Sequence, residues 1–201
     1  MSGLIRVVEH KSPKYTPRTY FNATSADITL ALAADLSTAG ERCTLRAAGG
    51  PEGGKYIGFE ISKSSDPIPL ARELYSFMKR RKAKTLNIAG NGIYTLRKYE
   101  IDQDWINEFT LRIIEKIHKH IGLDQIYTGG QTGVDLAGAV SASYLGIPAL
   151  ITLPRGYIQR FEEGKDVSMS KESVELQIQT QTQILKERVK VHMSQEVPDV
   201  Q

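Results

Sequence analysis

The segment TGGQTGVD, residues 128–135, contains the residue types that a loop needs in order to bind an anion. Gly129, Gly130 and Gly133 permit positive φ angles and let a ligand approach the backbone closely. An apolar run precedes the loop and a helix of small residues follows it, so the free N–H groups of the first helical turn would point at the loop. With the positive end of the helix dipole, these groups favour phosphate. A tight turn without a ligand uses the same glycines, and this alternative stays open.

The same loop also carries polar side chains. Gln131 and Thr132 can add hydrogen bonds to a ligand. Asp135 stands in the first turn of the expected helix, where it is either a favourable charge at the helix start or a group that binds a ribose or a base. The residue types alone leave both roles open.

A second loop, Ser37, Thr38, Ala39 and Gly40, lies between an apolar strand and another expected helix. Its first helical amides would face the carboxyl end of the strand, as in the glycine loop. Two such loops on neighbouring parallel strands would build one crevice, which is where open α/β sheets bind their ligands. The pair therefore predicts a binding site more strongly than either loop alone.

Two further loops follow predicted strands. Gly90 and Asn91 come after the strand at 85–89, and they either approach a ligand or form a plain turn rich in Asn and Gly. Arg155 and Tyr157 follow the last strand, where arginine suits a bidentate phosphate contact and tyrosine suits stacking on a base. A solvated surface is the other interpretation of this last loop.

Short β-rich apolar runs alternate with helical patterns, which predicts parallel βαβ units. The expected strands cover residues 5–9, 28–33, 56–61, 85–89, 125–128 and 149–153. The expected helices cover residues 39–48, 68–81, 103–121 and 134–144. We therefore predict an α/β fold, a Rossmann-like and mostly parallel sheet with helices on both faces.

The chain is expected to form one Rossmann-like ligand-binding domain over residues 1–170, followed by an amphipathic helix and a frayed tail over residues 171–201. In that helix Val174, Ile178, Leu185 and Val189 form one apolar stripe. The stripe either closes the domain or pairs with another subunit, and a homo-oligomer is expected.

Composition limits the function classes. The 201 residues carry a formal net charge of only +3, and the basic run at 79–84 resembles the solvated end of a helix, so we expect no nucleic-acid partner. Cys43 is the single cysteine, and neither a Cys/His metal cluster nor a Ser-His-Asp order is apparent. We expect no metal, no cofactor and no membrane span, and the chain reads as cytoplasmic.

The glycine loop also carries a resemblance to a known family. TGGQTGVDLAGAVSASYLGIPALITLPRG, from residue 128, is similar to the opening motif of the molybdenum-cofactor carrier family, which belongs to the SLOG group with the lonely-guy nucleotide hydrolases and the DNA-processing protein A fold. The segment from YTPRTYFN to GFEI and the segment ending in LNIAGNGIY resemble later parts of the family. The family places the glycine loop first, whereas this chain places it last. The chain therefore resembles a circular permutation of the family.

The resemblance implies a Rossmann-like crevice that binds a phosphorylated, nucleotide-like small molecule, which the protein carries or sequesters. The ligand-binding positions that it implies are Gly129, Gly130, Gln131, Thr132, Gly133, Asp135, Ser37, Thr38, Ala39, Gly40, Arg18, Thr19 and Asn22. The alternatives are a molybdenum-cofactor carrier and a lonely-guy-like nucleotide N-glycosidase. Counting from Gly40, the hydrolases' glutamate position falls on Thr44, and Glu41 is interpreted as a dipole-stabilising acid at the helix start, so we expect no catalytic residue. Asn91 and Gly92 stand where the family has Pro-Arg, which removes a possible phosphate-binding cation.

Overall fold

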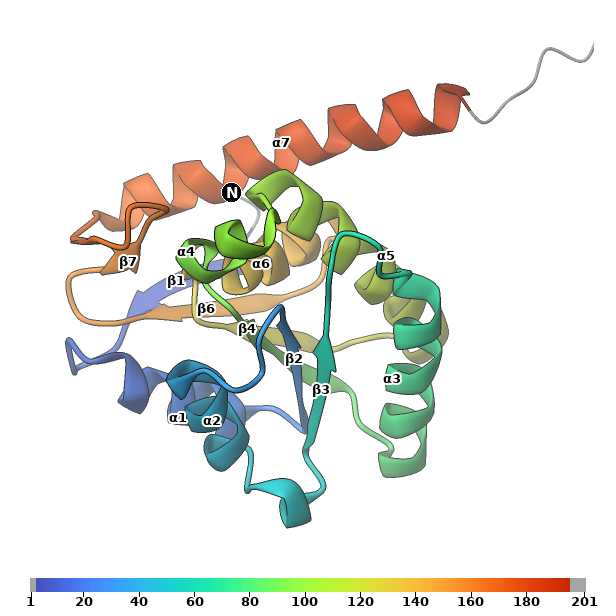
Figure 1. Ribbon diagram of the computed structural model, residues 1–201, viewed down its shortest axis with the longest axis horizontal. Coiled ribbons are helices and arrows are strands. Elements are labelled where there is room, and N and C mark those ends of the chain that lie inside the picture. The colour runs from blue at the N-terminus through green and yellow to red at the C-terminus, as the bar shows by residue number, and fades with distance from the viewer. Residues whose placement is uncertain (1–2, 196–201) are drawn as a thin grey trace, which may run out of the picture.

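One six-stranded parallel sheet forms the centre of the protein, whose computed structural model describes residues 3–195, with side chains described through residue 191 (Figure 1). The strands lie in the order β1-β6-β5-β4-β2-β3, and every pairing between them is parallel. Their bounds are β1 (Ile5–Glu9), β2 (Ile28–Ala33), β3 (Tyr56–Glu60), β4 (Thr85–Gly90), β5 (Gln125–Thr128) and β6 (Ala149–Leu153). The predicted α/β class is confirmed, and each strand ends within one residue of its predicted bounds. A small antiparallel hairpin, β7 (Gln159–Arg160) and β8 (Asp166–Val167), lies outside this sheet.

Seven α-helices are present in the described part of the chain, and five of them were predicted. Their bounds are α1 (Tyr15–Ser25), α2 (Ala39–Ala47), α3 (Pro67–Arg81), α4 (Ile93–Leu96), α5 (Gln103–Ile121), α6 (Val134–Leu145) and α7 (Lys171–Gln195). Two 3-10 turns, Pro51–Gly53 and Arg97–Tyr99, complete the elements. The sequence predicted neither α1 nor the short α4.

The helix starts follow from local capping. The side chain of Asp66 accepts a hydrogen bond from the Ile68 amide at the start of α3, and Asp102 caps α5 through the Trp105 amide. Such caps satisfy backbone donors that the first helical turn leaves without a partner. The caps therefore determine the residues at which α3 and α5 begin.

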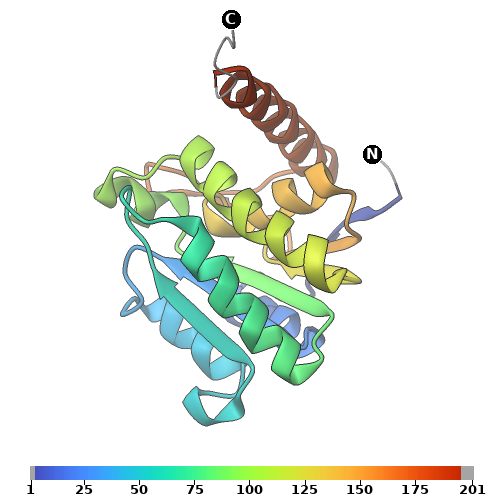
Figure 2. The ribbon, with the colours of Figure 1, turned by 90° about the vertical axis from the view of Figure 1, so that its right-hand side faces the viewer.

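Chain direction decides which face of the sheet each helix covers. From β1 through β2 to β3 the chain moves across the sheet one way, and α1 and α2 pack together on one face. From β3 through β4 and β5 to β6 the chain moves back, and α3, α5 and α6 cover the opposite face (Figure 2). Right-handed crossovers require this change of face. The connections after the adjacent strands β2 and β4 therefore diverge, which opens a crevice at their carboxyl ends.

Helix α7 packs against α6, α5 and β1 of the same chain. Val174, Ile178 and Leu185 are fully buried there. Of the two alternatives for the apolar stripe, closing the domain or pairing with another subunit, these three residues follow the first. Beyond this contact, α7 extends past the body of the protein (Figure 1). The helix includes Gln195, and the rest of the predicted frayed tail, residues 196–201, lies outside the described residues.

Candidate functional site

The crevice contains a cavity of about 400 Å³ between α1, α2 and the carboxyl end of β4. Small-molecule sites commonly measure about 300–1,000 Å³. Side chains of α1 form one wall, the first turns of α2 form the other, and Gln131, Asp135 and Arg160 contribute from the loops behind. The cavity thus lies where the strand order predicts a ligand.

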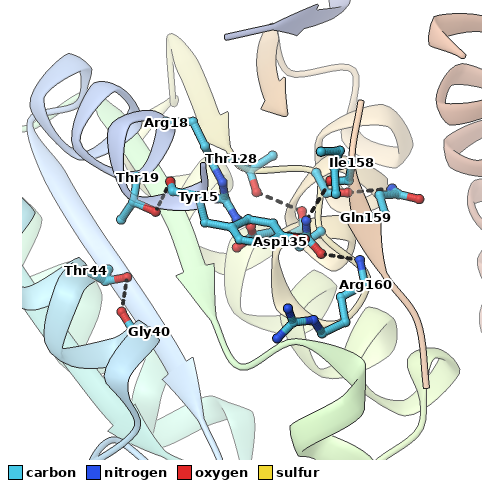
Figure 3. Close-up of polar contacts among 12 residues, drawn as sticks. Tyr15, Arg18, Thr19, Gly40, Thr44, Thr128, Asp135, Ile158, Gln159 and Arg160 are labelled. Atoms are coloured by element: carbon cyan, nitrogen blue, oxygen red, sulfur yellow. Dashed lines mark hydrogen bonds and ion pairs between the residues drawn. The ribbon is translucent and has the colours of Figure 1, made fainter. Parts of the chain in front are cut away.

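A buried ion pair joins α1 to the glycine loop. Nη1 of Arg18 donates to Oδ2 of Asp135 at 2.8 Å, and both side chains are almost wholly buried (Figure 3). Burial raises the pKa of the Asp135 carboxyl, while Arg18 and a hydrogen bond from the Gln131 backbone oppose this shift. The pair therefore leaves little net charge in this wall of the cavity.

The ion pair accounts for Gly129. A Cβ atom at this position would lie 1.5 Å from Nη1 of Arg18 and 2.2 Å from Oδ2 of Asp135, so only glycine fits beneath the pair. Gly130 has φ +68°, and its Cβ would lie 2.7 Å from Cγ2 of Ile151. Neither residue lines the cavity. Both glycines serve close packing, which is the alternative that the sequence left open.

The amides of the glycine loop already have partners within the protein. Gly133 N–H donates to Oε1 of Gln103 at 2.6 Å, and Val134 N–H donates to the carbonyl of Asn91 at 3.2 Å. Leu136 N–H donates to the Gln131 carbonyl at 2.8 Å. The expectation that the first turn of α6 offers free amides to an anion is therefore wrong for these three groups.

The polar side chains of the glycine loop bind the β7 strand. Nε2 of Gln131 donates to the Ile158 carbonyl at 2.8 Å, and its Oε1 accepts from the Arg160 amide at 2.8 Å (Figure 3). The hydroxyl of Thr132 donates to the Arg160 carbonyl, and Nε2 of Gln159 donates back to the Gly130 carbonyl at 2.7 Å. Gln131 still lines the cavity, whereas Thr132 and Gly133 lie outside it.

The second predicted loop does open into the cavity. Thr38 caps α2, because its Oγ1 accepts from the Glu41 amide at 3.3 Å. Thr38, Ala39 and Gly40 all line the cavity, and a Cβ at Gly40 would meet only Oγ1 of Thr38, at 3.9 Å. Ser37 lies outside, with its amide bonded to Oδ1 of Asp35 at 2.7 Å. The helix N-terminus that faces the cavity is thus that of α2.

Glu41 is the carboxyl group of this wall. Only 3% of the residue is exposed; its Oε1 accepts from Nδ2 of Asn91 at 3.2 Å, while Oε2 has no hydrogen-bond partner in the described structure. Burial, followed by the Asp135 carboxylate, raises the pKa of Glu41 to about 8, although Asn91 opposes the shift. Glu41 thus lies in the first turn of α2, as expected from the sequence, and the pKa of its carboxyl group is raised there rather than lowered. Thr44, where the sequence count placed the hydrolase glutamate, donates to the Gly40 carbonyl at 3.2 Å.

Unsatisfied polar atoms concentrate in the walls of the cavity. Nine buried side-chain polar atoms of the described residues lack a partner, and five belong to four cavity residues. These atoms are Nε of Arg18, Nδ2 and Oδ1 of Asn22, Oε2 of Glu41 and Oδ1 of Asn87. Because buried polar groups are normally hydrogen-bonded, such a cluster indicates a site for a polar ligand.

The remaining predicted residues divide between the cavity and other places. Thr19, Gly90 and Asn91 line the cavity, and Asn91 also ties two loops together through the Asp35 amide and carbonyl. Arg155 and Tyr157 lie outside it. The Arg155 amide bonds to the Ser12 carbonyl, and the Tyr157 ring packs against the core.

Sequence reasoning missed two parts of the site, Asn87 and the contact of Tyr15 with the hairpin, whereas Arg160 belongs to the loop after the last strand that the sequence did single out. Asn87 is a polar residue inside an apolar strand, which is a signal that the sequence did offer. Arg160 lines the cavity while its Nε and Nη2 donate to Asp166 at 2.8 and 3.2 Å. Tyr15 donates to the same carboxylate at 2.8 Å, and burial raises the pKa of Tyr15 to about 12. This contact between α1 and the hairpin has no local sequence signal.

Within residues 3–191, whose side chains are described, there is no group of three or more His, Cys, Asp or Glu side chains placed to hold a metal ion. None of the helices described there is long and apolar enough to span a bilayer. Comparisons of the chain with protein-family models, curated proteins and solved structures found no match. The resemblance to the molybdenum-cofactor carrier family accordingly stays a prediction.

Proposed function

We propose that the cavity binds a phosphorylated, nucleotide-like small molecule, with the phosphate at the N-terminus of α2. The observation that carries this proposal is the cluster of five unpartnered polar atoms in the cavity walls. A ligand with hydroxyl groups and ring nitrogens would supply the missing partners. The volume of about 400 Å³ suits a molecule of mononucleotide size.

Two features support the phosphate position. The open space at Gly40 lets an anion approach the first turn of α2, where the helix dipole is positive. The Arg160 guanidinium uses its Nε–Nη2 edge for Asp166, and its Nη1 makes no hydrogen bond with the described part of the chain. Asp166 thus holds a guanidinium at the cavity with a second edge available for a bidentate phosphate contact.

The test compares AMP with adenosine by calorimetry, for the wild type and for Gly40→Asp and Gly40→Ala. The space beside Gly40 accepts either side chain, but only aspartate places a negative charge where we expect the phosphate. Repulsion between charges about 4 Å apart costs about 1 kcal/mol in water and about 4 kcal/mol at an effective dielectric of 20. Gly40→Asp should therefore weaken AMP binding about fivefold or more, and Gly40→Ala should preserve it. Equal AMP affinity of the two variants would contradict the phosphate position.

A specific observation also favours a second function, hydrolysis of the ligand's N-glycosidic bond. Glu41 has a carboxyl group with pKa about 8 and an unpartnered oxygen in the cavity, so it is protonated near neutral pH and can act as a general acid. The count from Gly40 placed the hydrolases' glutamate on Thr44, so this second candidate rests on the position of Glu41 in the cavity wall and not on the family resemblance. Release of free base from AMP by the wild type, and none by Glu41→Gln, would establish this activity by mass spectrometry. Intact AMP with both proteins would leave binding as the function.

A further inference from the structure

We infer that Asn22 and Asn87 form a specificity subsite for a planar NH₂ group that has a hydrogen-bond acceptor beside it. This edge occurs on the amino side of adenine and on the primary carboxamide of nicotinamide. The inference rests on the proposed function and names the part of the ligand that the deep end of the cavity selects. Both asparagines are 2% exposed and both line the cavity.

The two asparagines reach the same cavity from different elements, α1 and β4. Arg18 and Asn22 are one turn apart on the buried side of α1, which runs back from the carboxyl end of β1 toward the start of β2. Asn22 therefore lies deeper than the ion pair. Asn87 precedes the end of β4 by three residues, and its Nδ2 reaches across to Thr29 on the neighbouring strand β2. The adjacent residue Ile88 points to the opposite face, toward α6.

Their hydrogen-bonding capacity is specific. Asn22 has one donor group and one acceptor without partners in the described structure. Nδ2 of Asn87 donates to Oγ1 of Thr29 at 3.2 Å, so the atom that Asn87 leaves without a partner is its acceptor Oδ1. The subsite thus presents two acceptors and one donor. The complementary ligand group is planar and carries two N–H donors and one acceptor. Asn22 would bond one N–H and the acceptor of that group, as asparagine does with adenine, and Asn87 would accept from the second N–H.

Replacing the amino group by oxygen removes this complementarity. In IMP the oxo group that replaces the amino group of AMP offers no donor to Oδ1 of Asn87. Nicotinic acid mononucleotide differs from nicotinamide mononucleotide in the same sense, because a carboxylate oxygen replaces the amide nitrogen. A site built to bond N–H groups discriminates strongly against a ligand that leaves its buried polar atoms unpaired.

The experiment measures dissociation constants by calorimetry for two matched pairs, AMP with IMP and nicotinamide mononucleotide with nicotinic acid mononucleotide. All four share ribose 5-phosphate, which is measured alone as well. We expect the amino member of at least one pair to bind about 5- to 150-fold more tightly, as for one bidentate base contact. The pair that shows the gap identifies the source of the edge as a base or a carboxamide. Asn22→Leu and Asn87→Leu should each reduce the gap.

Thr110→Val is the matched control, because Thr110 is also fully buried and unpartnered but lies on α5, on the other face of the sheet. A structural asparagine would lose stability on replacement, whereas a ligand-binding one with no protein partner should not, so Asn22→Leu should retain or raise the Tm. Equal binding within both pairs, or a gap that persists in all Asn22 and Asn87 variants, would overturn the subsite. If neither the nucleotides nor ribose 5-phosphate binds, the proposed function fails as well.

Discussion

Glu41→Gln should remove a pH dependence of stability that the wild-type protein shows. The pKa of Glu41 rises from an ordinary 4.5 to about 8, first because of burial and then because of the Asp135 carboxylate. Between these two pH values the folded protein holds a proton that the unfolded chain has released. The wild type therefore loses stability as pH rises through this window. Glutamine removes the titration and keeps an oxygen that can accept from Asn91.

The size of the effect follows from the two pKa values. Each pH unit between 4.5 and about 8 removes up to about 1.4 kcal/mol from the free energy of unfolding. The full window therefore corresponds to at most about 5 kcal/mol, of which about 3.5 kcal/mol falls between pH 5 and pH 8. Asp135, Asp35 and Arg18 are the charged groups that influence Glu41, and they are present in both proteins. Much of their own titration thus cancels when the proteins are compared.

The assay is urea unfolding at pH 5, 6, 7 and 8, in buffers without phosphate because phosphate is a candidate ligand. Trp105, the single tryptophan, stacks on Phe109 with ring centroids 4.7 Å apart and reports unfolding by fluorescence. The stability of Glu41→Gln minus that of the wild type should increase steadily with pH. A difference that is constant or decreasing over this range would refute the argument that Glu41 is buried and protonated.

Two further substitutions test the packing around the glycine loop. Gly129→Ala places a methyl group 1.5 Å from Nη1 of Arg18, so it should break the buried ion pair and cost about 3–5 kcal/mol in chemical denaturation; a loss below 1 kcal/mol would contradict this packing. Gln131→Leu removes the hydrogen bonds to the Ile158 carbonyl, just before β7, and from the Arg160 amide within β7, so it should speed amide hydrogen exchange at Arg160. Gln183→Leu, on the exposed side of α7, is the control and should leave exchange at Arg160 unchanged. Equal exchange at Arg160 in both variants would contradict the argument that Gln131 holds this segment in place.

The sequence predicted the sheet well because its strands are short apolar runs with no competing helical period. It missed α1 for a physical reason. The buried residues of α1 are Arg18, Asn22 and Ala23, whereas Tyr20 and Phe21 are about 40% exposed. A helix that directs polar groups toward a cavity has no apolar stripe to predict it. The helix α1, whose buried residues include Arg18 and Asn22, is thus one that forms a wall of the site.

The site was predicted at the level of loops but not of contacts. Thr38, Ala39 and Gly40 lie at the cavity, as expected from their place between a strand and a helix. Arg18 and Asn22, which the family resemblance implied, line it too. The sequence could not show which groups already had partners, because Gln103 and Asn91, which take the amides of α6, are distant in the chain. Hydrogen-bond partners of this kind depend on tertiary structure.

The charge balance of the cavity links the candidate ligand to Glu41. Asp135 compensates the charge of Arg18, and Asp166 that of Arg160, so an anion would depend on the first turn of α2, on the second edge of the Arg160 guanidinium and on the protonation of Glu41. When Glu41 ionises, it adds a negative charge inside the same cavity, which should weaken phosphate binding as pH rises through about 8. Linkage requires the reciprocal effect: a bound anion raises the pKa of Glu41 further and favours proton uptake. Protonation of Glu41 and anion binding would thus favour each other, and the same carboxyl group lowers the stability of the fold when it ionises above neutral pH.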